Sequence, residues 1–85
     1  MAKVEIYTTA WCSFCLAAKR LLSARGIAFE EIDVTMDRDL RAAMAGRAGG
    51  RRTVPQVFID GRHIGGCDDL YALDREGGLK PPVAA

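Results

Sequence analysis

The chain has 85 residues, of which 49% are hydrophobic and 27% are charged, and its formal net charge at pH 7 is +1. A chain of this length builds one compact core, so we expect a single domain over residues 1–85. The near-neutral charge excludes the strongly basic surface of a nucleic-acid or membrane-surface binder. No apolar run has the length of a secretory signal or a membrane span, so we expect a soluble, cytoplasmic protein.

The first two predicted elements are a strand and a helix. Residues 3–8 alternate apolar and polar side chains, which predicts a strand. Residues 13–25 carry apolar side chains at helical spacing, including Leu16 and Leu21. Gly26 then occupies the position that commonly follows a helix. The order predicts a strand that leads directly into a helix.

A second strand and helix follow. The strand is expected within residues 27–34, with Phe29 and Ile32 as its core residues. The helix is expected within residues 35–50, after a cap at Thr35 or Asp37, and before a pair of glycines. The inward face of this helix is predicted from four residues: Leu40, Ala43, Met44 and Arg47.

The last part of the chain predicts a hairpin and a third helix. Strands are expected over residues 55–60 and 62–66, because Asp60–Gly61 between them is a strong signal for a tight hairpin turn. The helix begins near Cys67, and the tail at 81–85 is expected to be frayed.

The predicted order is β-α-β-α-β-β-α, which gives an α/β fold with a mixed four-stranded sheet. The first strand–helix–strand unit requires a right-handed crossover between parallel strands. Cys12 and Cys15 fall at the first strand-to-helix junction. A C-x-x-C motif beside a β-α-β unit is typical of a thioredoxin-like redox site.

The two cysteines are suited to disulfide exchange. Cys12 is expected at a helix N-terminus, where unpaired N–H groups and the helix dipole favour a thiolate. Cys15, one turn further along, is expected to be less exposed and less acidic, as a resolving thiol. Two alternatives remain open: a pair of buried structural cysteines, and a zinc site that also uses His63 and Cys67.

The surroundings of the motif offer further candidates. Trp11 and Phe14 flank Cys12 and either shape a docking surface or pack against the sheet. The Val54–Pro55 bond is either cis, with Val54 free to pair with an extended peptide, or an ordinary trans bond at an edge strand. The helix start after Gly66 offers N–H groups to a carboxylate, and Asp68 offers a charge to an ammonium group. Together these features describe a site for a small peptide.

Nearly the whole chain resembles the glutaredoxins, and most closely the small bacterial dithiol type. The resemblance is carried by "VEIYTTAWCSFCLAAKRLL", by "RRTVPQVFIDGRHIGGCDDLYALDREGGL", and by the spacing between them. It implies a thioredoxin-like fold and glutathione-dependent thiol–disulfide exchange. It also implies that glutathione is a co-substrate and that no cofactor is tightly bound. The implied partners are disulfide-containing or glutathionylated proteins, including ribonucleotide reductase, and the protein is expected to be a monomer.

The resemblance also implies a role for individual residues. Cys12 matches the nucleophile and Cys15 the resolving cysteine of the family. One arginine, at position 51 or 52, is expected to meet the glycine carboxylate of glutathione. The full set of residues expected to bind glutathione is Phe14, Arg51, Arg52, Thr53, Val54, Pro55, Gly66, Cys67 and Asp68.

An alternative function follows from the motif itself. The common family motif is C-P-Y-C, whereas this chain has C-S-F-C, with Ser13 in place of the proline. With serine at this position, the chain resembles members of the family that hold a [2Fe-2S] cluster. In that alternative, Cys12 from each of two protomers and two glutathione thiolates ligate the cluster, and the protein is a dimer.

Overall fold

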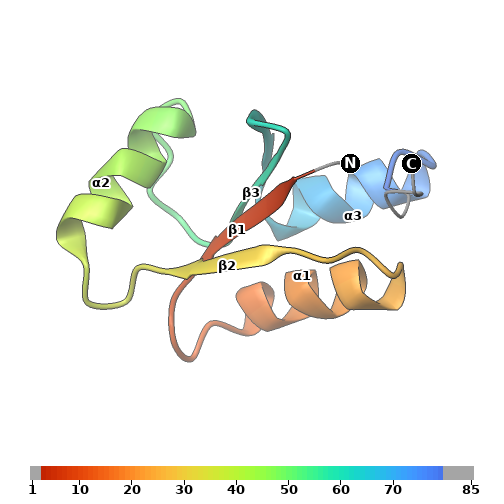
Figure 1. Ribbon diagram of the computed structural model, residues 1–85, viewed down its shortest axis with the longest axis horizontal. Helices are drawn as coiled ribbons and strands as arrows, with labels where there is room; N and C mark the ends of the chain where they lie inside the picture. Colours follow the sequence, from red (N-terminus) through yellow and green to blue (C-terminus); the bar gives the residue numbers. More distant parts are fainter. Residues whose placement is uncertain (1–2, 80–85) are drawn as a thin grey trace.

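A computed structural model describes residues 3–79, which form a four-stranded sheet and three helices (Figure 1). The sheet order is β2-β1-β3-β4, in which β1 is parallel to β2 and antiparallel to β3, and β3 is antiparallel to β4. The predicted element order and mixed sheet are therefore confirmed. The elements are β1 (Val4–Thr8), α1 (Ser13–Ala24), β2 (Glu30–Asp33), α2 (Arg38–Arg47), β3 (Gln56–Ile59), β4 (Arg62–Gly65) and α3 (Cys67–Arg75).

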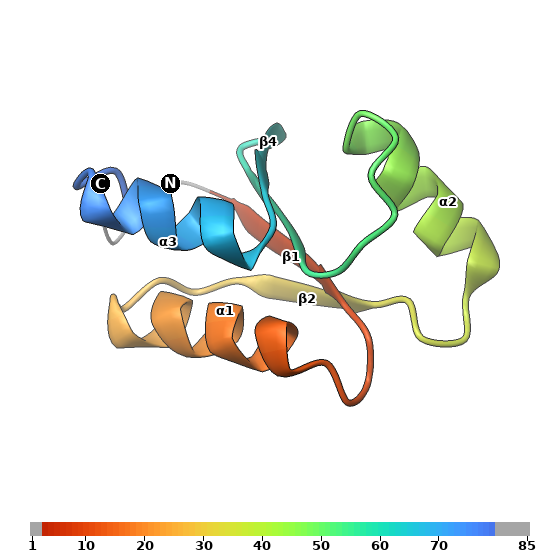
Figure 2. The same cartoon turned by 180° about the vertical axis from the view of Figure 1, so that it is seen from behind.

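Helices cover both faces of the sheet. Figures 1 and 2 show α1 and α3 side by side on one face, with α2 on the opposite side of the sheet. Since neighbouring strand residues point to opposite faces, β1 serves both layers. Ile6 joins the core under α1 and α3, whereas Tyr7 joins the core under α2. The side chains of β1 alternate between the two faces as expected, but both faces are buried, where one buried face was expected.

The predicted hairpin between β3 and β4 is present. Asp60 has a φ of 52° and Gly61 a φ of 81°, the left-handed conformation that a two-residue hairpin turn requires at both positions. The turn is also tied to β1, because the Asp60 side chain accepts a hydrogen bond of 2.8 Å from the Lys3 backbone N–H. The turn therefore fixes the register of the strands that lead to the end of the sheet near Cys12.

The buried face of α1 differs from the predicted one by a small rotation. Leu21 is buried as expected, but Leu16 is 45% exposed, and Cys15 and Ala18 are buried in its place. Several rows of apolar side chains at helical spacing were available in this segment. Packing against the sheet and α3 selects the row that contains Cys15, Ala18, Leu21 and Leu22.

The inward face of α2 was also only partly predicted. Met44 is fully buried, whereas Leu40 is 40% exposed and Ala43 is also exposed; Ala45 of the helix and Ala48 at its C-cap are buried instead. Arg47 lies against the sheet: its guanidinium is 4.1 Å from the centre of the Phe58 ring and donates to the Tyr7 hydroxyl at 2.8 Å. Arg47 was predicted on this face, and it completes the contact with the sheet as a cation over an aromatic ring. The Asp37 cap is confirmed, since its side chain accepts from the Leu40 N–H.

Within residues 3–79, no helix is long and apolar enough to cross a membrane. The predicted frayed tail at 81–85 lies outside the described residues.

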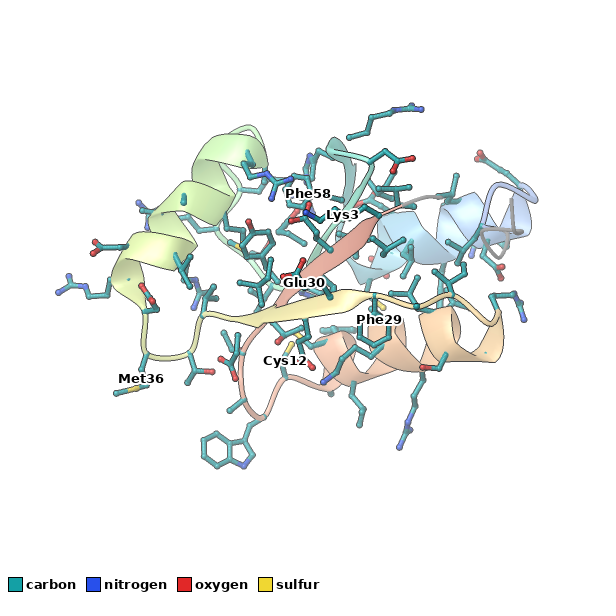
Figure 3. The ribbon with its side chains drawn as sticks, viewed as in Figure 1. Lys3, Cys12, Phe29, Glu30, Met36 and Phe58 are labelled. Atoms are coloured by element: carbon teal, nitrogen blue, oxygen red, sulfur yellow. The ribbon has the colours of Figure 1, made fainter. Side chains whose placement is uncertain are left out.

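The two methionines at 44 and 36 provide a matched test of the second core. Met44 is fully buried under α2, whereas Met36 is 93% exposed and points away from the molecule in Figure 3. Met44→Ala should lower the free energy of unfolding by about 2–5 kcal/mol, because it leaves a cavity among packed side chains. Met36→Ala should change it by less than about 0.5 kcal/mol. Urea denaturation followed by circular dichroism measures both, and equal effects would contradict the assigned core.

Candidate active site

Cys12 forms the N-terminal cap of α1. Its backbone is extended, with a φ of −102° and a ψ of 107°, and its sulfur accepts a hydrogen bond of 3.1 Å from the backbone N–H of Cys15. The preceding residue, Trp11, has a φ of 54°, which turns the chain sharply into the helix. The sulfur therefore lies where the first N–H groups of the helix favour negative charge, as predicted from the sequence.

Cys15 differs from Cys12 although the two belong to the same motif. Cys15 is 1% exposed, whereas Cys12 is half-buried, and both are free thiols in this structure. Burial, together with the hydrogen bond to Cys12, raises the pKa of Cys15 to about 12. The sequence-based expectation of a less exposed and less acidic second thiol is thus confirmed. Cys12 is thus suited to react as a thiolate, and Cys15 is suited to react afterwards as a protonated thiol.

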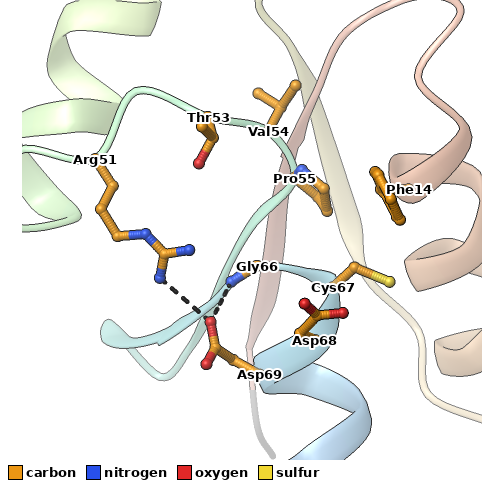
Figure 4. A pocket seen from close by; sticks show the side chains of 9 residues that line it. All are labelled: Phe14, Arg51, Thr53, Val54, Pro55, Gly66, Cys67, Asp68 and Asp69. Carbon is orange, nitrogen blue, oxygen red and sulfur yellow. Dashed lines mark hydrogen bonds and ion pairs between the residues drawn. The ribbon is translucent and has the colours of Figure 1, made fainter.

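A pocket of about 360 Å³ lies between the segment before Pro55 and the start of α3 (Figure 4). The Cys12 thiol donates a long contact of 3.9 Å to the Val54 carbonyl, which joins the cysteine to the pocket wall. The Val54–Pro55 bond is cis, one of the two alternatives left open by the sequence. The pocket is lined by Phe14, Arg51, Thr53, Val54, Pro55, Gly66, Cys67, Asp68 and Asp69.

The two candidate arginines have separate positions. Arg51 lines the pocket, and its guanidinium contacts the Asp69 carboxylate at 3.2 Å. Arg52 is exposed and does not line the pocket, and its carbonyl accepts two hydrogen bonds from Arg41 on α2. Of the two, Arg51 is therefore the one placed to meet an anion in this pocket.

Asp69 is a pocket residue that the sequence analysis did not single out. Its carboxylate accepts a hydrogen bond of 2.9 Å from the Gly66 N–H as well as the contact from Arg51 (Figure 4). Both interactions lower the pKa of Asp69, so the carboxylate is charged at neutral pH. The signal was available: an acid three residues after a helix cap commonly bonds back to the cap N–H. Asp69 fixes the start of α3 and the direction of Arg51 together.

A series of hydrogen bonds through a buried side chain begins at Thr53, which lines the pocket. The Gln56 side chain is fully buried and donates to the carbonyl of Thr53 at 3.0 Å and to its hydroxyl at 3.2 Å. Its other end, the Oε1 oxygen, lies 2.6 Å from Nε2 of His63 on β4. Because the Gln56 oxygen can only accept, His63 donates from Nε2. The segment before Pro55 is therefore tied to the hairpin strand that leads into α3.

Cys67 lines the pocket from the start of α3. Burial raises the pKa of its thiol, and the negative charges of Asp68 and Cys12 act in the same direction. A neutral thiol at this position is a weak nucleophile. We therefore expect the Cys67 side chain to line the pocket without reacting.

The zinc alternative finds no support in the described residues. In the part of the chain from 3 to 79, no three His, Cys, Asp or Glu side chains are grouped as ligands for a metal ion. His63 instead belongs to the hydrogen-bonded chain with Gln56. The alternative of two buried structural cysteines is also wrong for Cys12, which is half-buried at the helix start.

On the far side of Cys12 lies a second hollow, of about 520 Å³. Trp11, for which packing against the sheet edge was an alternative, is 98% exposed and borders this hollow. Its lining residues are Thr9, Ala10, Trp11, Cys12, Ser13, Cys15, Leu16, Lys19, Glu31 and Asp33.

The raised pKa of Cys15 predicts its resistance to alkylation. With a pKa of about 12, only about one Cys15 thiol in ten thousand is ionised at pH 8, and burial blocks access as well. In the folded, reduced protein, iodoacetamide at pH 8 should therefore modify Cys12 well before Cys15. Fragment-ion mass spectrometry separates the two sites, and urea-unfolded protein is the control in which both react. Equal rates in the folded protein would contradict the burial of Cys15.

Sequence comparisons place the chain among known proteins. The Glutaredoxin family model matches residues 4–64. Glutaredoxin 3 of Escherichia coli K12 is 56% identical over 81 residues, covering 95% of this chain and 96% of that protein. A probable glutaredoxin of Synechocystis is 54% identical over 80 residues, covering 94% and 91% of the two chains.

Solved structures agree with the sequence comparisons. The solution structure of a glutaredoxin from Brucella melitensis has a TM-score of 0.82 and 52% identity, covering 93% of this chain and 85% of that one. A buckwheat glutaredoxin–glutathione complex has a TM-score of 0.82 and 33% identity, covering 92% and 73%. With the Cys12–Cys15 pair at the start of α1, the chain belongs to the glutaredoxin family, has its thioredoxin-like fold, and is a thiol–disulfide oxidoreductase.

Proposed function

We propose that the protein is a glutathione-dependent reductase of protein disulfides and glutathione mixed disulfides. The observation that carries the proposal is the position of the Cys12 sulfur. It caps α1, with the Cys15 N–H at 3.1 Å, and contacts the wall of a peptide-sized pocket through Val54. A nucleophile is thus placed beside a site that can hold the rest of its substrate.

The dithiol route uses both cysteines. The Cys12 thiolate attacks one sulfur of the substrate disulfide, forms a mixed disulfide and releases the other half as a thiolate. The Cys15 thiol loses its proton as it attacks Cys12, and the second half leaves as a thiol. Two glutathione molecules then reduce the Cys12–Cys15 disulfide and become glutathione disulfide. Burial, which disfavours the Cys15 thiolate, makes the transfer of this proton to a leaving thiolate or a base part of the second step.

The pocket has the charges that glutathione requires. Glutathione carries two carboxylates and one ammonium group, and its central cysteine sits in an extended backbone. Arg51 and the N-terminus of α3 are suited to the carboxylates, and Asp68 is suited to the ammonium group. Val54 lies beside Cys12 and is suited to pair with the cysteine backbone. The buckwheat relative with a similar structure is a glutaredoxin–glutathione complex, which supports the same ligand here.

A monothiol route needs Cys12 alone. With a glutathionylated protein, Cys12 attacks the glutathione sulfur and the protein leaves as a thiolate. A second glutathione then attacks the Cys12–glutathione disulfide and releases glutathione disulfide. We propose that the protein acts this way as a monomer in the cytoplasm, where reduced glutathione is abundant, and that ribonucleotide reductase is one possible disulfide-bearing partner.

The cluster-binding alternative has less support. It rests on the C-S-F-C motif, and no contact among residues 3–79 adds to it. The retained Cys15, packed directly behind Cys12, is instead the arrangement that dithiol exchange uses.

A coupled assay with glutathione, glutathione reductase and NADPH tests the proposed function. The substrate is the mixed disulfide of glutathione and 2-mercaptoethanol. Cys12→Ser should abolish turnover, because it removes the nucleophile. Cys15→Ser should retain turnover of this small substrate but lose activity on a peptide disulfide. Cys67→Ser tests the third thiol, which is half-buried in the pocket wall; it keeps a side chain of similar size, so activity should stay within about twofold. An inactive wild-type protein that is folded and reduced would refute glutathione-dependent reduction.

The two arginines test the glutathione site. Arg51→Gln should raise the KM for the glutathione mixed disulfide about fivefold to tenfold, because one charge-assisted contact of about 1 kcal/mol is lost. Arg52→Gln is the matched control and should leave KM unchanged, since that side chain lies outside the pocket. Equal effects of both substitutions would show that general positive charge, and not the Arg51 position, determines binding.

A further inference from the structure

The second hollow has no lining residue in common with the proposed glutathione pocket, but Cys12 links the two, because it lines the second hollow and its sulfur contacts Val54 of the glutathione pocket. The glutathione pocket is formed by the segment before Pro55 and by the start of α3, whereas the second hollow is formed by the β1–α1 turn, by α1 and by β2. The Cys12 sulfur therefore lies between two cavities, of about 360 and 520 Å³. A tripeptide needs only the first of them.

One wall of the second hollow is apolar and open to solvent. Trp11 is 98% exposed, and Leu16, one helical turn after Cys12, is 45% exposed. Neither side chain is used by the cores on the two faces of the sheet. A fully exposed tryptophan beside a reactive sulfur is a typical anchor for a partner, because it buries much apolar area with little loss of side-chain freedom.

The opposite wall carries net negative charge. Glu31 and Asp33 on β2 both line the hollow, and hydrogen bonds lower the pKa of each, chiefly from Lys19 to Glu31 and from Thr35 to Asp33. Lys19 contacts Glu31 at 2.9 Å and balances its charge. Asp33 is exposed, and its hydrogen bonds come from the neutral Thr35. Asp33 forms no ion pair with a lining residue, and Lys19, which also acts on it, is bound to Glu31, so the lining keeps a net negative charge.

A polypeptide substrate differs from glutathione in extending beyond the attacked cysteine. When the substrate cysteine is bonded to Cys12, its backbone is placed to pair with Val54. The residues that follow it in the substrate must then extend away from the Cys12 sulfur. The second hollow begins at Cys12 itself. An apolar side chain next to the cysteine would meet Trp11 and Leu16, and a basic side chain after it would meet Asp33.

We propose that the second hollow binds the segment that follows the attacked cysteine in polypeptide disulfides, and favours an apolar residue followed by Arg or Lys. This inference rests on the proposed function, because it requires Cys12 to attack a substrate disulfide. It adds selection among polypeptides, which the glutathione pocket does not provide.

Two cyclic peptide disulfides test the inference. In one, each cysteine is followed by Leu-Arg, and in the other by Gly-Gln, with the rest of the sequence identical. In the glutathione-coupled assay, the wild-type protein should reduce the Leu-Arg peptide with a kcat/KM about tenfold higher, mainly through a lower KM. Trp11→Ala and Asp33→Asn should each remove much of this preference, and high salt should weaken only the part that depends on Asp33.

Controls separate the failure of this inference from the failure of the proposed function. Met36→Ala removes an equally exposed apolar side chain outside the hollow, and Asp39→Asn removes an acid on α2; both should keep the preference. The mixed disulfide of glutathione and 2-mercaptoethanol should be reduced equally by all four variants. If the wild-type protein reduces this small disulfide but does not distinguish the peptides, or if Trp11→Ala and Asp33→Asn keep the preference, the inference is wrong. If the small disulfide is not reduced, the proposed function fails first.

Discussion

The hydrogen bond from the Cys15 N–H to the Cys12 sulfur both begins helix α1 and positions the reactive sulfur. A helix must satisfy its first N–H groups, and here a thiol takes the place that Ser or Asp usually fills. The position of the sulfur is consequently fixed by the same interaction that starts α1. The packing of α1 against β1 and α3 then determines where the sulfur lies relative to Val54 and the pocket.

The difference between the two thiols follows from the geometry of a single helical turn. Cys12 precedes the helix and remains half-exposed, whereas Cys15 points from the first turn into the protein. One helical turn separates a position where N–H groups favour a negatively charged sulfur from a buried position that disfavours it. In the proposed mechanism, the position of the pair on α1 is sufficient to explain why Cys12 attacks first.

Much of the fold was predictable because its signals are local. The hairpin at Asp60–Gly61, the Asp37 cap and the C-x-x-C motif before a helix each depend on a few neighbouring residues, and the structure confirms them. Helix faces were less predictable. In α2, whose side chains are mostly small or charged, the row that packs inward depends on the opposite surface, so the exposure of Leu40 was missed. Asp69 was not singled out, because its second partner, Arg51, lies 18 residues away in the sequence.

The buried chain from Thr53 through Gln56 to His63 has a consequence for how the pocket binds. It connects the segment before Pro55 with the strand that enters α3, while Asp69 connects Arg51 to the same helix. Both walls are therefore held at a set separation before any ligand arrives. A peptide that enters such a preorganised pocket loses its own conformational entropy but requires little ordering of the protein. Binding can then be weak enough for rapid release of products and still be selective for shape and charge.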